Sequence, residues 1–576
     1  MSTPLKDTIA DRIHSVLPSE AGLSRDDLIA LIEVPSDAKL GDYAFPCFRL
    51  AKTLKKAPPL LAQELVAKLG ADAKATGPYV NFFIDYGQLA KNILANALTG
   101  AAFKVTPARK LPRTMIEFSQ PNTHKAFHVG HCRNVALGDA LVRMNRYLGY
   151  DVVAANYIGD EGTHIAKCLW YYMKFKPGAK PEGNAGEWLG GFYTAATQMV
   201  EDAPDDLKII YQKEISTILQ KIEGRDPAIT KLWEETKEWS MDSFREIYSW
   251  LGVKFDHYFY ESEVTDEARK IVEDGLKSGV FVNSQGAVGV DLNDLGLGFC
   301  MVLKSDGTTL YSTRDLALAR RKFEEFKIER SIYVVANEQE LHFKQVFKIL
   351  ERMGFPQVKN CHHLSYGLVM IPSGKMSSRL GNVIYFSALR EGLLNQVKEV
   401  AFKDLDTSGW SASEVDDTAQ KIAVAAIRYG MIASDPKKTI IFDMPQWLSF
   451  VGDTGPYLLY TYVRMRSILR KGEFTGTDVG YVDSAVFQGA EEKALLKRII
   501  NLNATVERAV NDQAPAPLAC FLFDFCQEFN SFYAKTSILK QDDPARKNTY
   551  LVLVAALAET LKTGAGLLGI DVPERM

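Results

Sequence analysis

The hydrophobic pattern of the first 110 residues predicts a mixed segment of helices and strands. Apolar residues recur with helical spacing over residues 60–69, and Gly70 follows where the helix would end. Residues 79–84 come directly after a Gly-Pro pair and are rich in the aromatic and β-branched residues of a strand. A basic, proline-containing stretch at 104–113 is typical of a linker. We therefore expect an α+β accessory domain over residues 1–110.

Strand and helix patterns alternate from about residue 114. A strand is predicted at 114–118, a helix at 129–147 that Gly149 closes, and a second strand at 151–155. This order predicts an α/β fold with a parallel, Rossmann-like sheet. Residues 168–280 are rich in helical patterns and are expected to form an insertion. Strands resume at 281–303 and, in a second half of the nucleotide fold, at 332–335.

The pattern is helical from about residue 390 nearly to the end. Apolar residues have helical spacing in four stretches, at 423–431, 457–469, 494–510 and 549–561. We therefore predict a Rossmann-like domain over residues 111–390, with its helical insertion near 168–280, and an all-α domain over 391–576.

Composition narrows the class of protein. The chain is 47% apolar and 24% charged with a net charge of -3, so a basic surface for nucleic acid would have to be local. Its seven cysteines are odd in number and include no C-x-x-C pair, which argues against a disulfide framework or a metal site. No secretory signal is visible, and the longest apolar run, 550–558, is too short to span a bilayer. We expect a cytoplasmic protein without membrane contact.

The first candidate for chemistry is the segment QPNTHKAFHVGH at 120–131, between the predicted strand and helix. His128 and His131 would present their rings on one helix face, and Gly130 would let a planar base approach the backbone. Lys125 adds a positive charge, and a helix N-terminus favours phosphate. These groups suit nucleotidyl transfer. Two surface histidines beside a helix cap are the alternative; a metal pair lacks a third ligand at a recognisable spacing.

The second candidate is the segment KMSSR at 375–379, which two glycines bracket as a mobile loop. Two cations and two hydroxyls could close over a triphosphate and release with pyrophosphate. Such a segment alone is more often a solvated basic loop. An H-x-G-H helix followed by such a loop is a far more specific indication of a nucleotide site than either segment alone.

The two segments together resemble the HIGH and KMSKS signatures of class I aminoacyl-tRNA synthetases, and their surroundings resemble the arginine-specific family. Residues 119–139 resemble that family's S-P-N-x-x-K-x-x-H-V-G-H-x-R-x-x-x-x-G-D segment, and 156–163 its N-x-x-G-D-W-G-T. Residues 306–317 resemble D-G-T-x-x-Y-x-T-R-D-x-A, and 339–343 Q-x-x-H-F. Further likenesses run over nearly the whole chain, at 41–43, 77–78, 453–457, 467–471, 568–570 and 573–576.

The resemblance implies that ATP activates L-arginine to arginyl-adenylate, which is then transferred to the 3′-terminal adenosine of a tRNA. AMP and pyrophosphate would be released, and bound tRNA would be needed for activation. It implies catalytic roles for Lys125, His128, His131, Lys375 and Arg379. ATP, with Mg²⁺ on its phosphates, would bind at His128, Gly130, His131, Lys375, Met376, Ser377 and Ser378.

A guanidinium ligand needs a carboxylate, because it is planar and always charged. The resemblance implies that Asp315 is that carboxylate, one helical turn after Tyr311. Asp151, at the start of a strand, is a second candidate carboxylate. The expected arginine site comprises Gln120, Pro121, Asn122, His131, Asp151, Asn156, Tyr311, Asp315 and Gln339.

The chain departs from the family pattern at several positions. Gln120 stands where serine is usual, Glu161 where tryptophan is usual and Asp453 where asparagine is usual. Leu459, Thr461 and Tyr462 depart from a Q-Y-A-H-A-R run. Ser378 occupies the place of the second lysine of KMSKS; an upstream lysine is thought to substitute in this family, and Lys125 fits that role.

A local basic region could serve a tRNA partner. Residues 421–471 carry eight Lys or Arg against three Asp, with interleaved aromatics, which suits contact with unpaired anticodon bases. A helical bundle with buried aromatics and solvated lysines would have the same composition. A small-molecule nucleotidyltransferase and a non-catalytic tRNA-binding relative remain as rivals. Among synthetases, a cysteine or glutamate enzyme is the nearest alternative, and a cysteine-specific site would be expected to use zinc. We expect a monomer.

Overall fold

The structure is a computed structural model, which describes residues 4–107, 109–305, 307–372, 374–375, 383–403, 407–476, 479–480 and 482–576. The chain divides into two compact units. The first comprises Met1–Val105, Arg464–Arg508 and Asp524–Thr563; the second comprises Thr106–Val463, Ala509–Phe523 and Gly564–Met576. The last helices contribute to both units, so these units cross the three-domain division, which stays a prediction.

The first unit begins with a three-stranded antiparallel sheet in the order β1-β3-β2 and its helices. Their bounds are β1 (Tyr43–Pro46), β2 (Ala73–Thr76), β3 (Tyr79–Phe82), α1 (Pro4–Val16), α2 (Arg25–Leu31), α3 (Phe48–Leu54), α4 (Pro58–Leu69) and α5 (Tyr86–Leu98). The predicted α4 is confirmed; it begins at two prolines, which the first turn tolerates, and ends at Gly70, whose N–H donates to the Val66 carbonyl.

The second unit is built on a five-stranded sheet in the order β11-β10-β4-β5-β6, in which every neighbouring pair is parallel. The strands are β4 (Thr114–Glu117), β5 (Val152–Ile158), β6 (His257–Tyr260), β10 (Arg330–Ala336) and β11 (Cys361–Tyr366). The predicted Rossmann-like sheet is therefore confirmed. The two halves of the sheet meet between β4 and β10, and such sheets bind ligands beyond the carboxyl ends of the strands at this point.

Helices and a second sheet cover the parallel sheet. Helix α6 (Val129–Tyr147) follows β4 and matches the predicted helix. The core joins alternate residues of β5 (Val153, Ala155 and Tyr157) to α11 (Thr265–Ser278), α12 (Tyr311–Phe326) and α13 (Glu340–Arg352). An antiparallel sheet packs into the same core; its strands are β7 (Val282–Ser284), β8 (Ala287–Asp291) and β9 (Phe299–Leu303). Strands 281–303 are thus separate from the parallel sheet.

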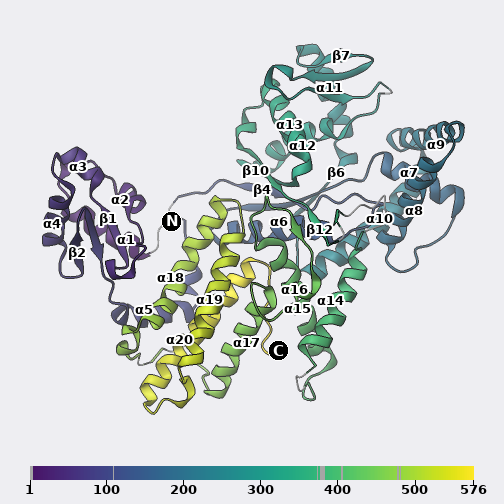
Figure 1. Cartoon of the computed structure of the whole chain (residues 1–576). Coiled ribbons are helices and arrows are strands. Elements are labelled where there is room, and N and C mark those ends of the chain that lie inside the picture. Colours follow the sequence, from purple (N-terminus) through teal and green to yellow (C-terminus); the bar gives the residue numbers. More distant parts are fainter. Residues whose placement is uncertain are drawn as a thin grey trace. The chain divides into compact units, whose positions relative to one another are not determined.

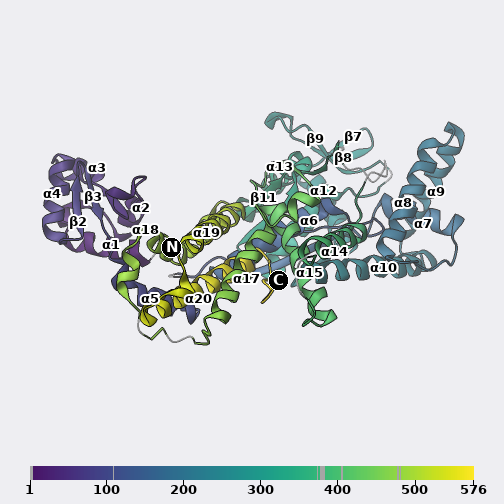
Figure 2. The same cartoon turned by 60° about the horizontal axis from the view of Figure 1, so that its bottom comes forward.

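The helical insertion is shorter than predicted. It consists of α7 (Thr163–Phe175), α8 (Ala185–Asp202), α9 (Asp205–Glu223) and α10 (Pro227–Leu251), and Figures 1 and 2 show α7, α8 and α9 grouped together. Residues 252–280 belong elsewhere, because β6 is an edge strand of the parallel sheet and α11 packs against its core. A strand of four residues is too short for its hydrophobic period to stand out beside long helices.

The described part of the last third is mainly helical, as predicted, and also contains the short strand β14. Strand β14 (Ile440–Ile441) pairs with β12 (Val369–Ile371), which also pairs with β13 (Gly374–Lys375). The helices are α14 (Phe386–Ala401), α15 (Ala412–Ile432), α16 (Met444–Trp447), α17 (Gly455–Lys471), α18 (Ala490–Asn511), α19 (Ala516–Lys535) and α20 (Pro544–Leu567).

Among the described residues, α20 alone is long and apolar enough to cross a membrane by length and composition. However, 78% of its apolar window is buried inside the protein, as in the core helix of a folded domain. The predicted absence of membrane contact stays a prediction.

Candidate active site

The loop after β4 runs along the carboxyl end of β5. The Thr123 N–H donates to the Gly159 carbonyl at 2.9 Å, and the Gly159 N–H donates to the Pro121 carbonyl at 3.1 Å. Gly159 leaves room for the Asn122 side chain, because a Cβ at 159 would lie 2.2 Å from Oδ1 of Asn122 in its present position. The loop therefore holds Pro121 and Asn122 at the edge of the sheet where ligands are expected.

The two histidines of the first signature cap their own helix. Nδ1 of His128 accepts from the Gly130 N–H at 3.1 Å, and Nδ1 of His131 accepts from the His128 N–H at 3.1 Å. The ring centroids lie 3.9 Å apart. These bonds satisfy backbone donors that a helix N-terminus otherwise leaves free.

Burial keeps both imidazoles neutral. It lowers the pKa of His128 to about 4 and holds the pKa of His131 well below its usual range, with His128 and Lys125 lowering the latter further. A neutral imidazole carries one N–H, and Nδ1 of each ring already accepts a hydrogen bond. Nε2 of each ring therefore carries the hydrogen and can donate to a ligand.

The first signature and the chain that follows the second signature line one cavity. The Val129 N–H donates to the Ile384 carbonyl at 3.1 Å, and the Phe386 N–H donates to the Phe127 carbonyl at 3.0 Å. The chain that follows the second signature is thereby bonded to the first. A cavity of about 170 Å³ lies here, lined by Pro121, Asn122, Lys125, Ala126, Phe127, His128, His131, Gly190, Tyr193, Thr194, Phe244 and Tyr385. Several of these come from α8 and α10 of the insertion, whose role in the site the sequence did not suggest.

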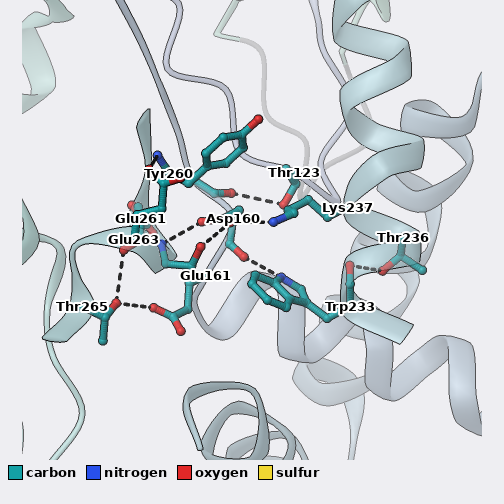
Figure 3. Close-up of polar contacts among 12 residues, drawn as sticks. Thr123, Asp160, Glu161, Trp233, Thr236, Lys237, Tyr260, Glu261, Glu263 and Thr265 are labelled. Carbon is teal, nitrogen blue, oxygen red and sulfur yellow. Dashed lines mark hydrogen bonds and ion pairs between the residues drawn. The ribbon is translucent and has the colours of Figure 1, made fainter. Parts of the chain in front are cut away.

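Helix α10 also holds the turn that joins β5 to α7. The indole N–H of Trp233 donates to the Asp160 carbonyl at 2.7 Å, and Nζ of Lys237 lies 3.4 Å from the Asp160 carboxylate (Figure 3). Asp160 also accepts from the Ser262 N–H at 2.9 Å, at the carboxyl end of β6. One aspartate thus joins β5, β6 and the insertion.

Two predicted substrate ligands are engaged inside the protein. Asn156 is fully buried; its Oδ1 accepts from the Gln120 N–H at 3.1 Å and its Nδ2 donates to the Tyr248 hydroxyl at 3.0 Å. Oε1 of Gln120 accepts from Asn134 at 2.9 Å, and Nε2 of Gln120 donates to Glu117 at 3.2 Å. These contacts shape the loop, and direct contact of Asn156 and Gln120 with the substrate stays a prediction.

Asp315 lies on α12 beside an aromatic pair. Its Oδ2 is 2.6 Å from Nε2 of His342 on α13, and the rings of Tyr311 and His342 are 4.6 Å apart. Tyr311 is 55% exposed, and Gln339, just before α13, is exposed. The structure thus brings Asp315 and Tyr311 together and adds His342 to them.

The sequence did not predict a role for the mostly buried acid that directly follows β6. Glu261 lies 2.7 Å from Arg314, and burial raises the pKa of this carboxyl to about 8 although Arg314 lowers it. The Tyr157 hydroxyl has no hydrogen-bond partner among the described residues, and its pKa is raised by burial and then by Glu261 and Asp315. Glu261 and Tyr157 therefore share an electrostatic environment with Asp315. The position of an acid at a strand end was the available signal, but β6 itself was not predicted.

Glu161, the departure from the usual tryptophan, lies in the same region. Its Oε2 accepts from the Thr265 hydroxyl at 2.6 Å (Figure 3) and is 3.9 Å from Arg314, while Oε1 has no partner among the described residues. Arg314 is therefore shared by two acidic residues, the buried Glu161 and the mostly buried Glu261.

The position of Asp151 corrects its predicted place in the arginine site. It precedes β5 at the amino end, whereas Gly159 follows the carboxyl end, and its side chain is 67% exposed and 3.4 Å from Arg113. At roughly 3.3 Å per strand residue, the length of β5 separates Asp151 from the cavity. It is an ordinary solvated acid at a strand edge, so we remove it from the arginine site.

The second signature is described only at its first residue. The backbone of Lys375 pairs with Met370 in the β12–β13 ladder. Met376, Ser377, Ser378 and Arg379, and Asp306 of another motif, lie outside the described residues. No group of three or more His, Cys, Asp or Glu within the described ranges has the arrangement of a metal site.

Comparisons with known proteins agree in sequence and fold. Residues 3–84 match the arginyl tRNA synthetase N terminal domain, 91–444 match the class I (R) tRNA synthetase catalytic domain, and 458–576 match the DALR anticodon binding domain. The arginine–tRNA ligase of Bdellovibrio bacteriovorus is 42% identical over 572 residues, covering 99% of this chain and 98% of that protein. That of Clostridium botulinum (strain Loch Maree) is 35% identical, covering 99% of this chain and 100% of that one.

A solved structure also has a similar fold. The Thermus thermophilus arginyl-tRNA synthetase superimposes with a TM-score of 0.80 at 26% identity, over 99% of this chain and 100% of that one. The family models together span most of the chain, and they include the catalytic domain that holds the cavity and both signatures. The chain therefore belongs to the arginyl-tRNA synthetase family of class I aminoacyl-tRNA synthetases.

Proposed function

We propose that this chain is an arginine–tRNA ligase that activates L-arginine with ATP and transfers it to the 3′-terminal adenosine of its tRNA. The observation that carries the proposal is the cavity that His128 and His131 of the first signature line together with Tyr385, which follows the second signature in the chain. The family membership reported above supports the choice of amino acid.

ATP would bind at the start of α6. The Nε2–H groups of His128 and His131 are positioned to donate to phosphate or ribose oxygens, and Lys125 lines the same cavity. The arginine carboxylate would attack the α-phosphorus in line, forming a new O–P bond while pyrophosphate leaves. The enzyme need supply only positioning and charge for this step. Gly130 would allow close approach of the base, and Lys375, Met376, Ser377, Ser378 and Arg379 would cover the triphosphate.

Mg²⁺ would arrive with ATP. The described residues show no preformed cluster of ligands for it, and Mg²⁺ on nucleotides is held largely by phosphate oxygens and water. We therefore assign no protein ligand to the ion.

The arginine guanidinium would bind at Asp315, with Tyr311 and Gln339 nearby and Glu261 as a second carboxylate. A carboxylate and a guanidinium form a strong, charge-assisted pair. The Tyr157 hydroxyl, which has no hydrogen-bond partner within the described ranges, would be a further acceptor for a guanidinium N–H. Pro121, Asn122 and His131 would contact the amino-acid end, because they line the cavity beside the expected α-phosphate.

tRNA is the expected second substrate, but several candidate contacts of the 421–471 region are unsuitable. Arg428, Tyr429 and Tyr462 are each 1% exposed, and Arg428 pairs with buried Asp139. They belong to the helical core. For these three residues this favours the alternative given for the 421–471 region, a helical bundle with buried aromatics. Tyr460 is 39% exposed and remains a candidate for base stacking. A monomeric state and a cytoplasmic location stay predictions.

One experiment tests the activity directly. Charging of total tRNA would be measured with each of the twenty amino acids, and we expect ester formation with arginine alone. His131→Ala is the matched inactive control. Charging with another amino acid would overturn the specificity, and pyrophosphate release that never depends on tRNA would favour a small-molecule nucleotidyltransferase.

A further inference from the structure

The ammonium group of Lys125 is in contact with an aromatic ring of the insertion. Nζ of Lys125 lies 4.9 Å from the ring centroid of Tyr193 on α8, and Tyr193 is 9% exposed. Both side chains line the cavity of His128 and His131. Lys125 makes no ion pair with a carboxylate in the described part of the chain.

The backbone on either side of Lys125 is also held by the insertion. His124 has a left-handed φ of +61° and is fully buried; its N–H donates to the Ser240 hydroxyl at 3.0 Å and its Nε2 is 2.8 Å from the Thr236 hydroxyl. Ser240 and Thr236 belong to α10, and Figure 3 shows Thr236 beside Trp233 on this helix. A residue other than glycine holds such a conformation only where its surroundings impose it.

Helix α8 lies close to the backbone of Ala126, the residue after Lys125. A Cβ added at Gly190 would lie 2.7 Å from the Ala126 nitrogen, so this helix approaches the loop backbone in a way that only glycine permits. Lys125 is thus held at His124 by α10, at Ala126 by α8 and at its ammonium by Tyr193.

We propose that the helical insertion is a positioning element for Lys125, and that Tyr193 is the residue that holds the ammonium in the cavity. The inference rests on the proposed function, in which Lys125 replaces the missing second lysine of KMSKS. A lysine side chain is flexible and must be restrained to act on the transition state. A carboxylate would restrain it but would also compete with phosphate for its charge. An aromatic face attracts the cation without neutralising it.

The alternative is that Tyr193 only packs the insertion. It belongs to the hydrophobic cluster that includes Tyr172, Leu189 and Phe192, so its loss could disturb α8 without any effect on Lys125. The experiment must therefore separate ring electrostatics from volume.

The measurement is arginine-dependent ATP–pyrophosphate exchange by the full-length protein with tRNA present. Tyr193→Leu should lower kcat on the order of tenfold, with little change in the KM for arginine, because a positioned charge acts mainly in the transition state. Tyr193→Phe keeps the ring and should retain nearly wild-type kcat. Phe192→Leu, on the same helix and in the same cluster, removes an aromatic ring without contact to Lys125 and should leave kcat unchanged.

A second series guards against misfolding of the leucine variant. Phenylalanine at 193 carrying one, two or three fluorines keeps its shape while its face becomes less negative, so kcat should fall stepwise with each fluorine. In a Lys125→Ala background, Tyr193→Leu should cause no further loss, because the ring acts only through the ammonium.

Each contrary result has a distinct meaning. Wild-type exchange by Lys125→Ala would overturn the role of Lys125 and the inference with it. A slow Lys125→Ala enzyme with a wild-type Tyr193→Leu enzyme would overturn the inference alone. A constant kcat across the fluorinated series, or an additive loss in the double variant, would show that Tyr193 only packs the helix.

Discussion

Nε2 of His342 lies 2.6 Å from Oδ2 of Asp315, so the carboxylate expected to bind the guanidinium already has a partner on the neighbouring helix α13. The contact leaves Oδ1 of Asp315 for a ligand and fixes the direction of the carboxylate. The ring of Tyr311 lies against the same histidine at 4.6 Å. A guanidinium would thus meet an oriented acid beside an aromatic face, the combination that suits a planar cation.

Asp315→Ala is expected to abolish the use of arginine while the fold is largely kept. Loss of a partly buried charged partner costs on the order of 2–5 kcal/mol of binding, or about 30-fold to several thousand-fold in affinity. Arginine-dependent exchange kinetics would measure this loss. Asp294→Ala removes a 62% exposed partner of Arg352 and should leave the arginine KM unchanged. Unchanged arginine KM and kcat in Asp315→Ala would remove this residue from the pocket.

Arginine affinity is expected to rise with pH between about 6 and 8. Burial raises the pKa of Glu261 to about 8, so its carboxyl is largely protonated in the free enzyme below that pH. A bound guanidinium favours the charged carboxylate, so binding releases a proton and strengthens as the pH approaches the raised pKa; above it the effect levels off. Calorimetry in buffers of different ionisation enthalpy would detect the released proton.

Glu261→Gln is the matched variant for this pH effect. It cannot ionise, so its arginine affinity should be weaker at pH 8 and independent of pH. A wild-type affinity that is constant from pH 6 to 8, with no proton release, would contradict the place given to Glu261.

Arg428→Leu is expected to destabilise the protein without a specific effect on tRNA contact. Arg428 pairs with buried Asp139 and donates to the carbonyls of Leu251 and Leu568, each at 2.9 Å. Breaking a buried pair costs about 3–5 kcal/mol; the lower end applies because Arg143 remains 2.7 Å from Asp139. Denaturant midpoints would measure the loss. Lys421→Ala, on the same helix with a surface partner, should change the midpoint little.

Exchange by the full-length protein is expected to be almost absent until tRNA is added. The motivation is the family resemblance, and binding of tRNA should weaken steeply with salt because phosphate contacts dominate the affinity. Point variants are preferable to a truncation from residue 405, which would remove Arg428 and leave Asp139 of α6 without that partner. Brisk arginine-dependent exchange without tRNA would refute the requirement.

Local pattern and motif spacing were sufficient for much of this protein. The helix at α4 with its glycine end, the β4–α6–β5 order and the H-x-G-H turn follow from periodicity and from residues adjacent in the chain. The identity of the family was likewise available from motifs, because such signatures are contiguous segments. Asp315 and Tyr311 could be placed together because they lie one turn apart on one helix.

Tertiary structure decided which distant residues meet. β6 became part of the parallel sheet, and with it Glu261 came near Asp315, although 54 residues separate them in the chain. Strand direction removed Asp151 from the site, and packing made Asn156 and Arg428 internal supports. It also brought Tyr193 of the insertion over Lys125. Hydrophobic periodicity specifies which face of an element is buried, but not which other element covers it; sheet order and close packing make that choice, and they assemble the site.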